Sequence, residues 1–85
     1  MVTGAQMKAE GVKKGFPDIE LSVPCGRFHG LFIELKRREG GRVSPEQSEW
    51  LNRLSEKGYR AVVCYGWHDA KTVIEQYLAL GAPCG

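Results

Sequence analysis

The apolar positions of the chain alternate between the spacing of strands and that of helices. Residues 19–23 alternate apolar and polar side chains, as a half-buried strand does. Residues 30–36 and 59–65 are nearly continuous apolar or aromatic runs, which favours strands inside a sheet. A short turn-rich segment separates the first two strands, so we expect them to form an antiparallel hairpin.

A capped helix start follows the second predicted strand. Ser44 stands at the N-cap position, Pro45 at the first helical position, and Gln47 where a capping box places Glu or Gln. Apolar residues then recur at helical spacing. With a last helix and a weaker first one, the predicted order is helix (3–12), strand (19–23), strand (30–36), helix (45–57), strand (59–65) and helix (67–80).

This order predicts the fold class. A hairpin followed by a strand–helix–strand crossover gives a mixed sheet with helices packed against it, which is an α/β fold. We assign Trp50 and Trp67 to core or dimer packing rather than to base stacking. The spacing also predicts buried faces, made of Ile19, Leu21 and Val23 in the first strand and Ala70, Val73, Ile74, Tyr77 and Leu78 in the last helix.

Length and composition limit the class of protein. A chain of 85 residues has room for one core, so we expect residues 1–85 to form a single domain. Apolar content of 42% with 26% charged residues is typical of a soluble globular protein. No segment has the roughly 18 apolar residues of a membrane span, and the N-terminus lacks a signal-peptide pattern. Three cysteines without metal-type spacing indicate reduced thiols, so we expect a cytoplasmic protein.

Positive charge is unevenly distributed. The net charge of +2 is too small to indicate nucleic-acid binding, but the segment 36–42 contains four cations and two glycines. A flexible basic loop of this kind can follow a phosphate backbone. A loop that is cationic only for solubility is the alternative.

One polar pair interrupts the buried strand 30–36. Side chains alternate faces in a strand, so Glu34 and Lys36 point the same way, and across the hairpin Asp18 can come near them. Two carboxylates offer oxygen ligands for Mg²⁺, and an adjacent ammonium can orient water or stabilise charge in phosphodiester cleavage. Ordinary ion pairs are the alternative, and we assign Glu20 on the same face to solvent.

The same residues resemble a nuclease signature. Pro17-Asp18 followed by Glu34-Leu35-Lys36 is similar to the PD-(D/E)xK motif. With the segments 15–18 and 42–47, the chain resembles the virus-type replication-repair nuclease (VRR-NUC) family in its short, stand-alone, phage-like form. The resemblance implies a restriction-endonuclease-like core and a metal-dependent DNA endonuclease that uses Mg²⁺, with Mn²⁺ able to substitute.

The resemblance also implies roles for residues of the motif. Asp18 and Glu34 match the metal-binding carboxylates, the backbone carbonyl of Leu35 completes the metal shell, and Lys36 matches the catalytic lysine. Gln47 matches a supporting glutamine on the following helix, and together these side chains form the candidate catalytic set.

Other residues are assigned around this set. Gln47 has the capping box with Ser44 as its alternative role. Glu10 is the nearest candidate for a further acidic metal ligand on the first helix. The candidate DNA-binding residues are Lys13, Lys14, Arg37, Arg38 and Arg42.

Substrate and assembly also follow from the resemblance. Similarity to Holliday junction resolvases implies a homodimer that acts on branched or structured DNA in repair, in a bacterial or phage-infected cytoplasm. The alternatives are a non-catalytic nucleic-acid-binding module on a nuclease scaffold and a structural subunit of a repair complex. The set of Asp18, Glu34 and Lys36 favours the enzyme, because carboxylates beside a phosphate path repel it without a metal.

Overall fold

The computed structural model describes residues 14–83, which form a three-stranded sheet and two helices. The strand order is β1-β2-β3, with β1 antiparallel and β3 parallel to β2. This mixed sheet confirms the predicted α/β fold class. The helix predicted over residues 3–12 lies outside the described residues. The bounds are β1 (Ile19–Leu21), β2 (Leu31–Lys36), α2 (Pro45–Glu56), β3 (Arg60–Tyr65) and α3 (Trp67–Leu78).

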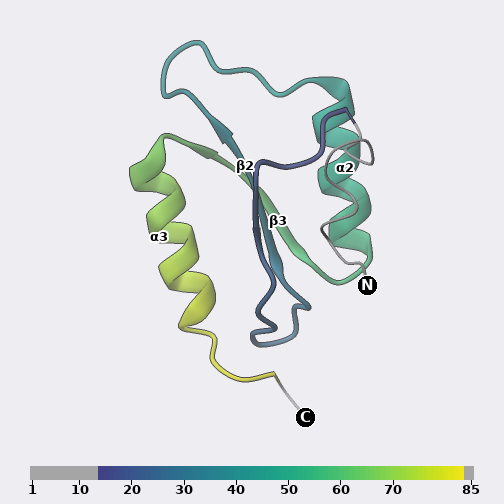
Figure 1. The fold of residues 1–85 in the computed structure, drawn as a ribbon, viewed down its shortest axis with the longest axis vertical. Coiled ribbons are helices and arrows are strands. Elements are labelled where there is room, and N and C mark those ends of the chain that lie inside the picture. Colours follow the sequence, from purple (N-terminus) through teal and green to yellow (C-terminus); the bar gives the residue numbers. More distant parts are fainter. Residues whose placement is uncertain (1–13, 84–85) are drawn as a thin grey trace.

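β2 is the central strand, and the two helices lie on opposite sides of the sheet (Figure 1). Leu31 and Ile33 are fully buried in one core cluster. The same cluster includes Cys64 of β3 and Ala70 and Tyr77 of α3, so this face of β2 is the one that α3 covers. Burial on both faces explains why β2 reads as a continuous apolar run.

Aromatic rings fill the space on the α2 side. The ring of Phe16 lies edge-to-face against Phe32 at 5.7 Å and against Trp50 at 5.0 Å between centroids. Phe32 also packs against Tyr59 at 5.2 Å. Because Phe32 and Glu34 share one face of β2, this aromatic cluster forms an apolar wall beside Glu34. The alternation of side chains along β2 places Phe32 on the same face as Glu34. The contact of Phe32 with Phe16 depends on tertiary packing.

α2 begins at the capping box that the sequence predicts. Gln47 donates its backbone N–H to Ser44 Oγ at 3.1 Å, and Ser44 donates its backbone N–H to Gln47 Oε1 at 2.8 Å. Leu51 and Leu54 are buried on the inner side of the helix. Among the described residues, neither helix has the length and apolar character needed to cross a membrane.

Two predicted buried positions are wrong. Val23 is 41% exposed because β1 already ends at Leu21. Leu78 is 47% exposed at the last residue of α3. Trp67 is 60% exposed at the first residue of α3, so it is not a core residue of one copy, and its packing in a dimer stays a prediction. Periodicity identifies an apolar stripe, but it does not show where the layer covering that stripe ends.

Candidate functional site

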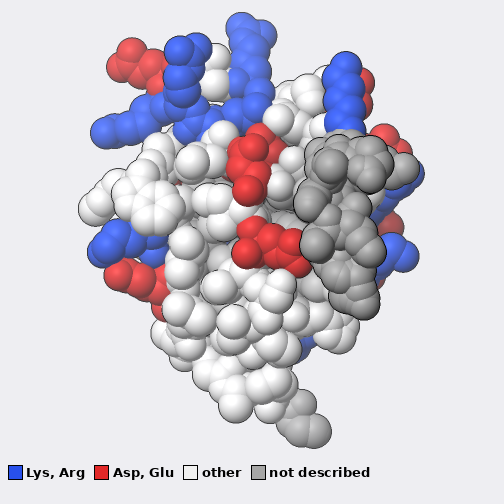
Figure 2. Space-filling view, viewed as in Figure 1, with Lys and Arg blue, Asp and Glu red and all other residues white. Residues whose placement is uncertain are grey.

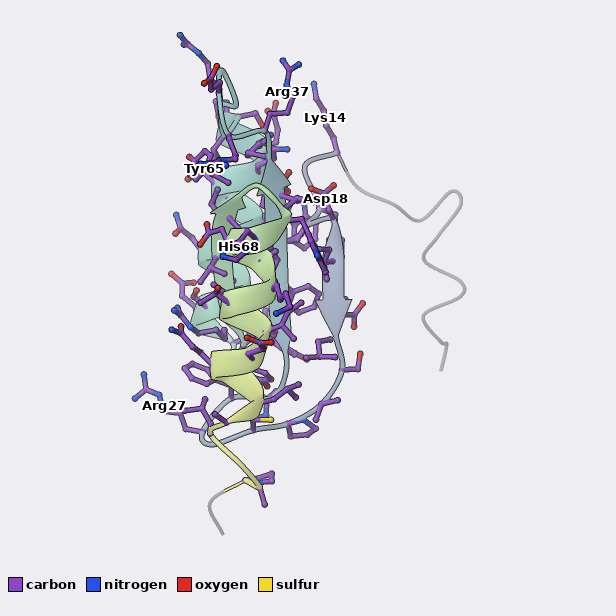
Figure 3. All side chains as sticks on the ribbon, turned by 90° about the vertical axis from the view of Figure 1, so that its left-hand side faces the viewer. Lys14, Asp18, Arg27, Arg37, Tyr65 and His68 are labelled. Carbon is purple, nitrogen blue, oxygen red and sulfur yellow. The ribbon has the colours of Figure 1, made fainter. Side chains whose placement is uncertain are left out.

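The strand register brings Asp18 beside Glu34. Ile19 pairs with Ile33 in the antiparallel ladder, so the residue before Ile19 lies next to the residue after Ile33. The Asp18 Oδ2 atom accepts a hydrogen bond from the backbone N–H of Leu35 at 2.9 Å. β1 begins one residue later, so the Asp18 side chain satisfies a β2 donor that lies beyond the end of the ladder. Asp18 is exposed at the start of β1 (Figure 3).

Glu34 is buried, and its two carboxylate oxygens differ. Glu34 is 2% exposed. Oε2 accepts a hydrogen bond from Gln47 Nε2 at 2.8 Å and lies 3.6 Å from Lys36 Nζ. Oε1 is buried and receives no hydrogen bond within residues 14–83. A buried carboxylate oxygen without a donor is unfavourable, so Oε1 is an atom that a cation can satisfy.

The surroundings of Glu34 favour its neutral form. Burial raises the pKa of Glu34 from 4.5 to about 6, with a further contribution from the neighbouring Asp18 carboxylate, while the Lys36 ammonium opposes both. The site therefore holds a carboxylate in an environment that is short of positive charge. Such a carboxylate gains from a cation bound between it and Asp18.

The backbone of β2 directs a carbonyl to the same place. The N–H and C=O of one strand residue point toward the same neighbouring strand. The carbonyl of Lys36 accepts from Gly66 N at 2.8 Å, on the β3 side. Leu35, whose N–H faces Asp18, therefore directs its carbonyl toward the Asp18 side. The carbonyl of Leu35, the predicted third oxygen ligand, therefore lies on the same side of β2 as Asp18.

Gln47 takes part in the capping box and also contacts Glu34 of the candidate site. Its Oε1 accepts from Ser44 N in the capping box while its Nε2 donates to Glu34. The amide oxygen is committed to the helix start, so the amide nitrogen faces the carboxylate. The first turn of α2 thereby fixes the position of Glu34 Oε2.

The predicted basic residues that the structure describes lie at the same end of the molecule. Arg37, Arg38 and Arg42 are exposed on the loop that follows β2. Lys14 is 84% exposed in its side chain, with Nζ 3.9 Å from Glu46 Oε2. Figure 2 shows several Lys and Arg side chains at this end of the molecule, beyond the acidic groups at the middle of this face. In Figure 3, Lys14 and Arg37 lie at the end that carries Asp18.

The acidic set is small. Glu10 lies outside the described residues, as does Lys13 of the basic set. Glu20 accepts from Ser22 Oγ at 2.9 Å and is exposed, which fits its assignment to solvent. Residues 14–83 contain no group of three or more His, Cys, Asp and Glu side chains that could hold a metal ion. The available donors are two carboxylates and one carbonyl, a set that fits Mg²⁺, which keeps several waters and uses one or two carboxylates.

The fold and the site define the class of protein: in a small mixed sheet, two carboxylates and a lysine lie together at the end of the central strand. Residues 3–68 match the family model of the VRR-NUC domain. A solved structure of a VRR_NUC domain protein is 40% identical, with a TM-score of 0.85 over 95% of this chain and 66% of the other. No curated protein sequence matches the chain.

The chain belongs to the VRR-NUC family, and the resemblance seen in its motifs is confirmed. VRR-NUC is a nuclease family, which implies binding of DNA. The chain spans 66% of the length of the related solved protein. The activity of the whole related protein is therefore not carried over by the match itself.

Proposed function

We propose that the protein is a divalent-cation-dependent endonuclease that hydrolyses phosphodiester bonds in DNA. One observation carries the proposal: Glu34 Oε1 is buried without a donor from residues 14–83, and Asp18 is beside it. A cation that binds both carboxylates removes the penalty of burying this oxygen. Membership of a nuclease family supports the same chemistry.

Some residues of the site would hold the cation, and others would act on the attacking water and the phosphate. Asp18, Glu34 and the carbonyl of Leu35 would hold the cation, Mg²⁺ or in its place Mn²⁺. When bound, the cation supplies Lewis acidity at the phosphate and lowers the pKa of water. Lys36 Nζ orients the attacking water and stabilises the negative charge that develops on the phosphate. Gln47 holds Glu34 Oε2, so that Oε1 stays directed to the cation.

The basic loop supplies the electrostatic attraction. Arg37, Arg38 and Arg42, with Lys14 beside α2, bind phosphates that flank the cleaved bond. These cations have exposed side chains close to the end of β2, where phosphate contacts need to be. Few phosphates can be reached from one loop, so binding by this loop alone is weak and salt-dependent.

We also propose that residues 1–85 act as one domain and that two copies form a homodimer on branched or structured DNA, such as a Holliday junction, in the cytoplasm. Two copies present two basic loops and two sites to one substrate, which raises the avidity without a new contact. A branched DNA offers two phosphate paths at a fixed angle, which matches a two-fold pair of sites.

A cleavage panel tests the activity. The substrates are four-way junction, flap, single-stranded and supercoiled DNA with Mg²⁺ or Mn²⁺, and Lys36→Ala is run beside the unchanged protein. We expect metal-dependent cutting that the variant lacks, with branched substrates cut best. Binding of DNA without cleavage of any substrate would favour the non-catalytic module. Calorimetry of Glu34→Gln with Mg²⁺ tests the ligand assignment, and unchanged affinity would remove Glu34 from the set.

A further inference from the structure

A hollow lies on the other side of Lys36 from Asp18. Its lining comes from the loop after β2, the end of β3 and the first turns of α3. Tyr65 pairs with Lys36 in the β2–β3 ladder. Asp18 lies opposite Glu34, two residues before Lys36, so Asp18 and Tyr65 are two strand spacings apart across the sheet and two residues apart along it, or roughly 12 Å in all. The residues that line the hollow are Arg38, Tyr65, His68, Asp69 and Thr72.

Arg38 is placed at this hollow and is free to bind an anion. Its aliphatic stem lies over Gly66, where an added Cβ would be 2.7 Å from Arg38 Cγ. Gly66 has a φ of +91°, a backbone conformation that favours glycine. Arg38 forms no ion pair with any acid of residues 14–83. Its planar guanidinium suits a phosphate oxygen pair.

The other residues that line the hollow include an aromatic ring on which a base can stack. The Asp69 carboxylate is already used, because its Oδ2 accepts from Tyr65 N at 2.9 Å. Tyr65 is 45% exposed at the last residue of β3, and His68 lies close to it at this end of the molecule (Figure 3). The N-cap of α3 is Gly66, which provides no side chain to the first-turn amides. Within residues 14–83, positive charge and an aromatic ring that stacks on no other ring therefore lie side by side.

We infer that this hollow is a nucleotide subsite in which Arg38 binds a phosphate and Tyr65 stacks on an unpaired base. The inference rests on the proposed nuclease function and specifies its substrate. A separation of roughly 12 Å places the subsite within a few nucleotides of the cleaved bond. A base that stacks on a side chain has left the duplex, so the subsite selects DNA with a single-stranded arm beside the cut.

The test places the fluorescent base 2-aminopurine at successive positions of a single-stranded arm joined to a duplex. The full chain binds this DNA with Ca²⁺ in place of Mg²⁺, which keeps the DNA intact for the measurement. We expect quenching to peak at one position, within a few nucleotides of the cut made with Mg²⁺. Tyr65→Ala abolishes the peak and weakens binding about tenfold, whereas Tyr65→Phe keeps both.

Arginine variants test the phosphate contact. Arg38→Gln lowers the slope of log affinity against log salt by about one. Arg27→Gln is the matched control, because Arg27 is also exposed but lies at the opposite end of the molecule (Figure 3). It leaves the slope unchanged.

The outcomes separate this inference from the proposed function. Equal quenching at all positions, or a peak that survives in Tyr65→Ala, overturns the subsite, while metal-dependent cleavage in the same preparation leaves the nuclease function standing. An unchanged protein that neither binds nor cuts overturns both. Circular dichroism verifies folding, and Tyr65→Leu, which keeps apolar bulk without a ring, replaces Tyr65→Ala if that variant unfolds.

Discussion

Gln47 donates from Nε2 to Glu34 Oε2 at 2.8 Å while its own Oε1 accepts from Ser44 N at 2.8 Å. One amide therefore starts helix α2 and holds a buried carboxylate of strand β2. The basic loop connects these two elements, so the same contact closes the loop at its base. The start of α2 and the position of the candidate metal ligand are consequently coupled.

Gln47→Glu separates the two roles. The new carboxylate can still accept from Ser44 N, but it has no donor for Glu34, and two carboxylates then face each other. The pKa of Glu34, about 6, means that this residue is mostly protonated at about pH 5 and ionised at about pH 8. We expect near-normal stability at the lower pH and a loss of about 1–3 kcal/mol at the higher one, measured by thermal unfolding.

The matched control for this variant is Ser44→Ala. It removes the N-cap hydroxyl that accepts from Gln47 N but does not place a charge near Glu34. A loss of about 1 kcal/mol is expected at both pH values. If Gln47→Glu also lost about 1 kcal/mol of stability at both pH values, the contact with Glu34 would make no electrostatic contribution.

Glu34→Gln is expected to stabilise the metal-free protein at high pH. Folding raises the pKa of Glu34 from 4.5 to about 6, so folding favours the protonated carboxyl. This contribution is complete below about pH 4.5 and is lost as the pH rises through about 6. The difference between these two pKa values corresponds to about 2 kcal/mol in the free energy of unfolding. Neutral glutamine avoids the loss, so the variant gains up to that amount at about pH 8 and almost nothing at about pH 4.

Denaturant unfolding of the two proteins in a chelator measures this difference. Glu20→Gln is the control for the loss of one negative charge, because Glu20 is an exposed acid on the neighbouring strand. A stability gain in Glu34→Gln of equal size at both pH values would contradict the assignment to ionisation. The same variant loses the proposed cation site, so increased stability would accompany lost cleavage.

Lys36→Ala is expected to lower cleavage at least about a hundredfold while DNA binding changes little. The Lys36 side chain is 17% exposed and lies against Glu34, so it contributes little to phosphate binding at the exposed surface. Lys71→Ala is the control, because Lys71 is an exposed lysine that pairs with Glu75 at 3.0 Å on α3. Single-turnover cleavage and fluorescence anisotropy separate the two quantities. An equal loss of binding and cleavage would make Lys36 a binding residue.

The basic loop is expected to act through charge alone. Arg37→Gln and Arg42→Gln each remove one exposed cation, so each lowers the salt slope of DNA binding by about one. Arg53→Gln is the control, because Arg53 is an exposed arginine of α2 that pairs with Glu49 at 3.4 Å. Binding measured at several salt concentrations checks the prediction. A slope that stays unchanged in both loop variants would mean that the loop is cationic only for solubility.

Local signals in the sequence account for much of this fold. Ser44 and Gln47 predict the start of α2, because the capping box depends on neighbours along the chain. The alternation of β2 places Glu34 and Lys36 on one face for the same reason. The bond from Gln47 to Glu34 depends on how α2 packs against the sheet, and no spacing along the chain encodes it. Helical spacing does not show that Trp67, the first residue of α3, is exposed in one copy of the chain.

Gly15 is expected to position the first turn of α2 by close packing. It has a φ of +86°, and an added Cβ would lie 2.7 Å from the Glu46 carbonyl carbon and 2.9 Å from Gln47 N. Gly40 has a similar φ of +80°, but nothing lies within 4 Å of its added Cβ. Gly40→Ala therefore measures the backbone penalty alone, about 1 kcal/mol.

Gly15→Ala adds the displacement of α2 to that penalty. The backbone of Gln47 has to move, and its amide then no longer meets both Ser44 N and Glu34 Oε2. We expect Gly15→Ala to destabilise the protein by at least about 2 kcal/mol and to lower cleavage, whereas Gly40→Ala affects stability slightly and cleavage not at all. Denaturant unfolding and the junction cleavage assay measure the two effects. Equal losses in the two variants would mean that contact with Gly15 does not position Gln47.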